Sequence, residues 1–119
     1  MENPFNMIYY HNPRCRKSRE GLAYLNENNI YPEIREYLKD LISREELKSI
    51  LKKLNIDAID LLRKNESVYK TNIKGKDLNN EEIIIEMVEN PKLIERPILV
   101  SEEKAIIGRP KENLLKIKG

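Results

Sequence analysis

The chain has 119 residues, with 22 basic and 20 acidic side chains, one cysteine, one histidine and a net charge of +2. One Cys and one His cannot supply the three or four ligands of a typical zinc site, and a lone Cys cannot form a disulfide within the chain. The charges are interspersed and the apolar runs fall far short of the ~20 residues of a membrane span, so we expect neither nucleic acid nor a membrane as partner.

This length is sufficient for one domain with its own core, and no repeat or linker divides the sequence. We therefore expect a single domain over residues 1–119, acting as a monomer. No secretory signal is visible at the N-terminus, so we expect a reducing cytoplasm in which the thiol is free.

The first part of the chain predicts a strand, a helix and a second strand. Residues 7–10 are aromatic and β-branched, residues 16–28 are helix formers that stop at two asparagines, and residues 33–37 have a weaker strand pattern. The side chains expected on the inner face of the helix are Leu22, Ala23 and Leu25.

Residues 41–92 predict a block of helices. The run from Ser43 to Glu46 has the form of a capping box, and leucine and isoleucine follow it at helical spacing. A short helix is predicted over residues 58–63. Another begins at residues 79–82, again with the capping-box form, and ends before Pro91.

Two short strands, residues 98–100 and 105–107, and a helix that begins at Pro110 complete the chain. The sequence therefore predicts an α/β domain. Its mixed sheet has about four strands, and a helical insertion of roughly residues 41–92 separates the second strand from the third.

The single cysteine, Cys15, stands in the run HNPRCRKSR of residues 11–19, between the first strand and the first helix. Free N–H groups at a helix start, the helix dipole and basic neighbours all favour a thiolate, and the same N–H groups can receive an oxyanion. An inert, buried cysteine is the alternative. A phosphatase loop would need an arginine where Gly21 stands, and a dithiol motif would need a cysteine where Ser18 stands.

Two polar residues lie close to this cysteine in the sequence. His11 could act as a general base or serve as a structural hydrogen-bonding residue. Ser18, one turn into the helix, could donate a hydrogen bond to the thiolate or be an ordinary first-turn residue.

Three arginines stand in apolar or turn settings, namely Arg63 in DLLRKN, Arg96 in LIERPILV and Arg109 in IIGRPK. Such an arginine stays solvated, forms an ion pair or binds a ligand. Since Arg96 and Arg109 flank the last two strands, each just before a proline, we expect them to converge on one end of the sheet.

In this order, HNPRCRKSR, LLRKN, LIERPILV and IIGRP resemble the motifs of the glutaredoxin-dependent arsenate reductase (ArsC) family, which has a thioredoxin-like fold. The resemblance runs over residues 7–117. It implies that Cys15 attacks arsenate to form a thiol–arsenate adduct. It also implies that glutathione and glutaredoxin supply the reducing equivalents without a bound cofactor or metal.

The same resemblance implies roles for the other residues of these motifs. His11 and Ser18 would tune the thiol, and Pro97 would be a cis residue that faces the active-site loop. The residues that would neutralise the oxyanion are Arg63, Arg96 and Arg109.

The alternative class is a regulator of the Spx type, which shares the fold and binds RNA polymerase. Such proteins commonly carry a Cys-x-x-Cys pair, whose second position is Ser18 in this chain. A redox-inactive binding module and a glutathione-dependent thiol reductase with another substrate are also open on the sequence.

Overall fold

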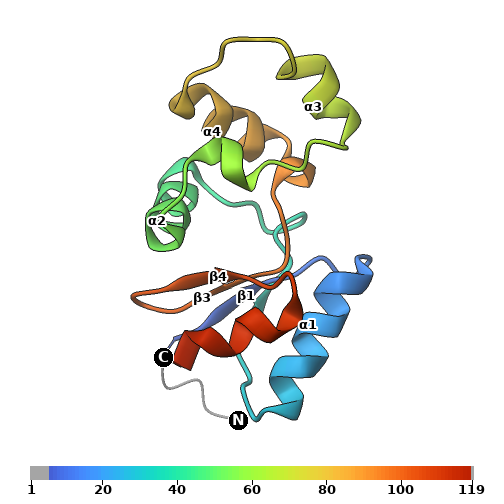
Figure 1. Cartoon of the computed structure of the whole chain (residues 1–119), viewed down its shortest axis with the longest axis vertical. Helices are drawn as coiled ribbons and strands as arrows, with labels where there is room; N and C mark the ends of the chain where they lie inside the picture. Colours follow the sequence, from blue (N-terminus) through green and yellow to red (C-terminus); the bar gives the residue numbers. More distant parts are fainter. Residues whose placement is uncertain (1–5, 119) are drawn as a thin grey trace. The chain divides into compact units, whose positions relative to one another are not determined.

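The computed structural model describes residues 6–118 and divides them into two compact units (Figure 1). An α/β unit is formed by residues 6–40 and 96–118, and a helical unit by residues 41–95. The helical unit lies between the second and third strands in the chain, as predicted. That both units make one domain stays a prediction.

The α/β unit is built on a sheet of four short strands, and Figure 1 shows its central part. The strands are β1 (Ile8–Tyr10), β2 (Glu33–Arg35), β3 (Ile98–Val100) and β4 (Ala105–Ile107). Their order is β2-β1-β3-β4, where β2 is parallel to β1 and the other two pairs are antiparallel. The predicted mixed sheet is confirmed, although β2 ends two residues earlier than expected.

Helices α1 (Arg16–Glu27) and η3 (Lys111–Lys118, a 3-10 helix) pack on one face of this sheet (Figure 1). Tyr9 and Leu99 of the sheet share one core with Leu25 of α1 and Leu114 of η3, and all four are fully buried. Burying one large apolar side chain contributes about 1.5–3 kcal/mol. This core therefore fixes α1 against β1 and sets the position of the loop between them.

The inner face of α1 differs from the predicted one. Ser18, Gly21 and Leu25 are buried and Leu22 is half-buried, whereas Ala23 is exposed. The expectation for Ala23 was wrong because two residues advance about 200° around a helix, which turns Ala23 away from the side that Leu25 faces.

Two glycines allow a close approach between α1, the start of β3 and η3. A Cβ on Gly21 would meet the Tyr9 hydroxyl and would lie 3.2 Å from Leu114 Cδ1. A Cβ on Gly108 would lie 2.9 Å from Pro97 Cγ and from Leu114 Cδ2. Pro97 and Leu114 therefore occupy the space that side chains at these two positions would need.

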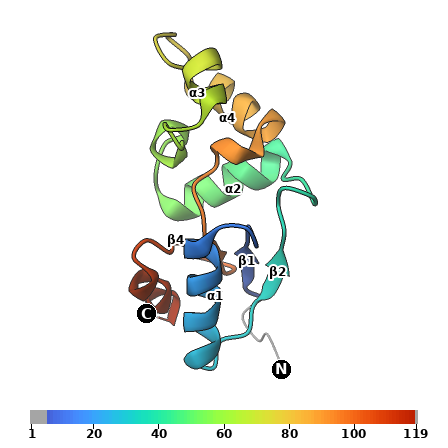
Figure 2. The same cartoon turned by 90° about the vertical axis from the view of Figure 1, so that its right-hand side faces the viewer.

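The helical unit consists of five short helices (Figure 2), which are α2 (Arg44–Leu54), η1 (Ala58–Leu61), α3 (Ser67–Asn72), α4 (Asn80–Glu89) and η2 (Pro91–Leu93). The predicted helix starts are confirmed, because Ser43 caps α2 and a complete capping box of Asn79 and Glu82 caps α4. The sequence did not predict α3, since this helix buries none of its residues and so carries no apolar period. It also missed η2, a single turn.

None of the helices between residues 6 and 118 is both long and apolar enough to span a membrane.

We expect Gly21→Ala to lower the free energy of unfolding by about 1–3 kcal/mol, since the added methyl group overpacks the contact with Tyr9 and Leu114. Urea denaturation measures this difference. Asn26→Ala, at an exposed position of the same helix, is the control and should stay within about 0.5 kcal/mol of the wild type. Similar stabilities for both variants would contradict the close approach.

Candidate functional site

Cys15 is the N-cap residue of α1. Its backbone is extended (φ −92°, ψ 121°), its N–H donates to the Asn12 carbonyl over 2.9 Å, and its carbonyl accepts from the Arg19 N–H over 3.0 Å. The cysteine therefore stands where the N–H groups of the first turn lack intrahelical partners and the helix dipole is positive. No acidic residue lies in this turn. The thiol is free and the residue is 8% exposed.

Three hydrogen bonds tie the first turn of α1 to β1 and the residues that follow it. The Tyr9 hydroxyl donates to the Ser18 carbonyl over 2.6 Å. The Ser18 hydroxyl accepts from the Asn12 N–H over 3.0 Å and lies 2.7 Å from His11 Nδ1. Ser18 is fully buried, so these bonds are shielded from water. These bonds join the two ends of the loop that carries Cys15.

The surroundings of His11 favour its neutral form. Burial lowers its pKa below the usual 6.5; the charge of Glu36 acts against this and that of Arg19 reinforces it. Because the Ser18 hydroxyl already accepts from Asn12, it can give its own proton to the Nδ1 atom of a neutral imidazole. Both sequence candidates, His11 and Ser18, thus support the loop, and their tuning of the thiol stays a prediction.

Tyr9 is a site residue that the sequence reasoning missed. It was assigned only to the buried strand, yet its hydroxyl is one of the three attachments of Ser18. The sequence could have indicated this role, because side chains alternate between the two faces of a strand, which places residues 9 and 11 on the same face. Their rings lie 5.6 Å apart.

Two of the arginines near Cys15 in the sequence have partners other than the sulfur. Arg16 forms an ion pair with Glu20 at 2.9 Å and its side chain is 85% exposed. Arg19 donates to the Pro13 carbonyl over 2.9 Å. Proximity in the sequence therefore does not place these charges on the thiol.

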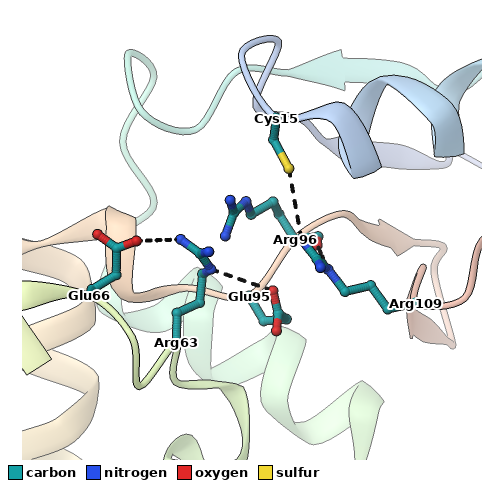
Figure 3. Close-up of polar contacts among 6 residues, drawn as sticks. All are labelled: Cys15, Arg63, Glu66, Glu95, Arg96 and Arg109. Carbon is teal, nitrogen blue, oxygen red and sulfur yellow. Dashed lines mark hydrogen bonds and ion pairs between the residues drawn. The ribbon is translucent and has the colours of Figure 1, made fainter.

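A cation does reach the sulfur from the part of the chain that follows β4, and it is Arg109. Its NH2 atom lies 3.8 Å from Cys15 Sγ, and its Nε donates to the Arg96 carbonyl over 2.8 Å (Figure 3). Arg96 itself has buried Nε and NH1 atoms. One guanidinium thus connects the cysteine to the backbone that precedes β3.

Both arginines precede cis peptide bonds, Arg96–Pro97 and Arg109–Pro110. The cis form of Pro97 implied by the family resemblance is therefore present. The Pro97 carbonyl also accepts a hydrogen bond of 2.9 Å from the Gly108 N–H, which joins the start of β3 to the residue before Arg109.

Arg63 belongs to the helical unit and is paired with carboxylates of that unit. Its NH1 lies 2.5 Å from Glu66 Oε2 and its Nε 3.7 Å from Glu95 Oε1 (Figure 3). Its N–H donates to the Leu93 carbonyl over 2.8 Å. The sequence signal for Glu66 as a partner is its i, i+3 spacing from Arg63. That Arg63 binds an oxyanion stays a prediction.

Within residues 6–118, no three His, Cys, Asp or Glu side chains are grouped so that they could hold a metal ion.

The fold and the site define a class of protein with a thioredoxin-like α/β fold and a single cysteine at the start of the helix that follows the first strand. The model of the ArsC family matches residues 10–117. The chain belongs to the ArsC family.

Individual relatives agree with this assignment. The chain is 47% identical to the uncharacterized protein YfgD of Escherichia coli, with 92% of this chain and 94% of the relative covered. It is 45% identical to an arsenate reductase of Haemophilus influenzae, with 94% and 98% covered. The solved arsenate reductase of Vibrio cholerae superposes with a TM-score of 0.89 at 41% identity, with 93% and 96% covered. The family and fold that the sequence motifs indicated are confirmed.

Replacing His11 by Asn should reduce the pH dependence of stability. The folded-state pKa lies below the unfolded value of 6.5, so the stabilisation is complete above that pH and is lost as pH falls through the folded-state value. Urea denaturation at about pH 7.5 and about pH 5.5 should show a larger loss for the wild type, since His11 is the only histidine. An equal loss in both proteins would refute the buried, neutral imidazole.

Replacing Arg109 by Gln should slow the reaction of Cys15 with iodoacetamide at pH 7 about two- to fivefold. The change removes the cation 3.8 Å from the sulfur, and the estimate is kept small because Arg109 is exposed. Arg16→Gln is the matched control, because Arg16 is next to the cysteine in sequence but pairs with Glu20. Equal slowing in both variants would remove the special role of Arg109.

Proposed function

We propose that this chain is a thiol-dependent arsenate reductase whose nucleophile is Cys15. The observation that carries the proposal is a thiol at a helix N-terminus with the Arg109 guanidinium 3.8 Å from its sulfur. Both features stabilise negative charge, first on the thiolate and then on a bound oxyanion. The arsenate reductases named among the relatives supply the chemical identity of that oxyanion.

In the first step, the Cys15 thiolate attacks arsenate. A sulfur–arsenic bond forms, one arsenic–oxygen bond breaks, and the departing oxygen leaves as water once it has taken up protons. Arsenic stays in the +5 state. The adduct carries negative charge on its remaining oxygens, which the N–H groups at the start of α1 and the guanidinium of Arg109 can stabilise.

In the second step, the thiolate of glutathione attacks the Cys15 sulfur. The electron pair of the sulfur–arsenic bond passes to arsenic, which leaves as arsenite in the +3 state, while the two sulfurs form a disulfide. A further thiol, from glutaredoxin or a second glutathione, attacks that disulfide and releases the Cys15 thiolate. The scheme uses one protein thiol, in agreement with the single cysteine, and it suits a reducing cytoplasm.

The supporting residues follow from the geometry and the family motifs together. Arg96 and Arg109 are joined by a hydrogen bond and would hold the oxyanion from the α/β unit. For Arg63 the role rests on the motif LLRKN, and an oxyanion would have to replace the carboxylate of Glu66 as its partner. His11 and Ser18 would keep the thiol loop in place.

Cys15→Ser should abolish arsenite production in an assay with arsenate, glutathione and glutaredoxin, because a hydroxyl oxygen cannot donate the electron pair that reduces arsenic. The wild-type chain should produce arsenite under the same conditions. Residual activity above a few per cent of wild type in the variant would argue against Cys15 as the nucleophile. Thiol–disulfide exchange at Cys15 without arsenite production would replace arsenate with another substrate.

A further inference from the structure

Strand β2 forms one edge of the sheet in the α/β unit, and Figure 2 shows it beside β1. Within residues 6–118, β2 is bonded to β1 on one side and has no strand on its other side. An open strand edge presents backbone N–H and C=O groups that can pair with a further strand. The edge of β2 is therefore a surface to which another strand can be added.

Ile34 is the residue of β2 whose backbone faces the open side. The Glu33 N–H donates to the Met7 carbonyl over 2.9 Å, and the Arg35 carbonyl accepts from the His11 N–H over 2.9 Å. Because the backbone groups of successive strand residues point to opposite sides of the strand, the N–H and C=O of Ile34 point away from β1. Its apolar side chain is 49% exposed. Ile34 thus offers both hydrogen-bonding groups and apolar surface at the edge.

The two residues that flank Ile34 carry opposite charges, an exposed Glu33 before it and Arg35 after it. If two copies of β2 pair antiparallel with Ile34 opposite Ile34, residue 33 of each copy lies opposite residue 35 of the other. Symmetry then makes two contacts between a carboxylate and a guanidinium. A parallel pair in register would instead place like charges opposite each other. The edge is therefore complementary to a second copy of itself in the antiparallel direction.

Contacts within the chain hold the Arg35 side chain at this edge. Its Nε lies 2.9 Å from Asp40 Oδ2, and its guanidinium carbon lies 6.0 Å from the centre of the Tyr10 ring. A guanidinium has five N–H donors, so it can bind a second carboxylate while it keeps Asp40. An arginine that is already ordered loses less side-chain entropy when Glu33 of another copy binds to it.

We propose that two copies of this chain pair antiparallel through β2, with the two-fold axis at Ile34, and so join their four-stranded sheets into one. Each Ile34 donates its N–H to the carbonyl of the other Ile34. Each chain has one such edge and uses it once, so the assembly closes as a dimer. Pro32 has no N–H and keeps the paired stretch short, which makes the dimer weak. This dimer replaces the monomer that the sequence led us to expect.

Sedimentation equilibrium of the full chain, from about 10 µM to about 1 mM protein, tests the dimer. The average mass of the wild type should rise from that of a monomer toward that of a dimer. Ile34→Lys should raise the dissociation constant at least about tenfold, because it places two ammonium groups opposite each other. The matched control is Ile59→Lys, which changes an isoleucine of similar exposure, 47%, in η1 and should leave the constant unchanged. A wild type that stays monomeric, or equal weakening in both variants, would overturn the proposal.

A charge exchange tests the antiparallel register. Glu33→Arg places cations opposite each other in both symmetric contacts, and Arg35→Glu places carboxylates opposite each other. Neither variant should dimerise alone at concentrations where the wild type does. An equimolar mixture of the two should dimerise, because the mixed pair sets two cations of one copy against two carboxylates of the other. Once circular dichroism shows that both variants are folded, a mixture that stays monomeric would refute this pairing.

A third measurement leaves the charges of β2 unchanged. Opposite residues of a hydrogen-bonded antiparallel pair have Cα atoms about 5.5 Å apart, a separation that suits a disulfide. In a Cys15→Ser background, Ile34→Cys should therefore form a covalent dimer on oxidation at least about tenfold faster than Ile59→Cys. Equal rates for the two variants would contradict the interface. None of these experiments contains arsenate, so their outcome is independent of the arsenite assay.

Discussion

The attachment of Ser18 to β1 is the constraint on which the site depends. A cysteine at the start of a helix is useful only if that start has a fixed position. Here the Tyr9 hydroxyl holds the Ser18 carbonyl, and His11 and Asn12 hold its hydroxyl. The bonds of Ser18 with Tyr9 and His11 are buried, so each would be costly to leave unsatisfied. The sheet thereby positions the thiol.

Much of the fold could be predicted because several local signals agreed. Capping residues marked the starts of α2 and α4, and short apolar runs between turn residues marked the strands. What failed was information that is not local. Helix α3 buries no side chain, so its sequence has no apolar periodicity. The inner face of α1 includes Gly21, which lies there because a side chain at this position would collide with Tyr9 and Leu114.

The sequence predicted which residues belong to the site better than it predicted the contacts between them. Cys15 stands at the predicted helix start, but charge density along the sequence was a poor guide to the electrostatics around it. Arg16 is engaged by Glu20, and the guanidinium near the sulfur belongs to Arg109, 94 residues away. Contacts at such separations depend on the sheet order β2-β1-β3-β4, which brings β3 beside β1 and β4 next to β3. Sequence spacing alone does not encode that order.

A lone cysteine capping α1 also determines how the protein depends on its surroundings. A protein with two paired thiols can reduce its substrate by forming an internal disulfide, which is reduced again afterwards. In the proposed reaction this chain supplies only one of the two thiols, so each turnover stops at the Cys15 adduct until a thiol from another molecule reacts with it. Its turnover rate then depends on the concentration of the reduced thiol donor as much as on the concentration of substrate.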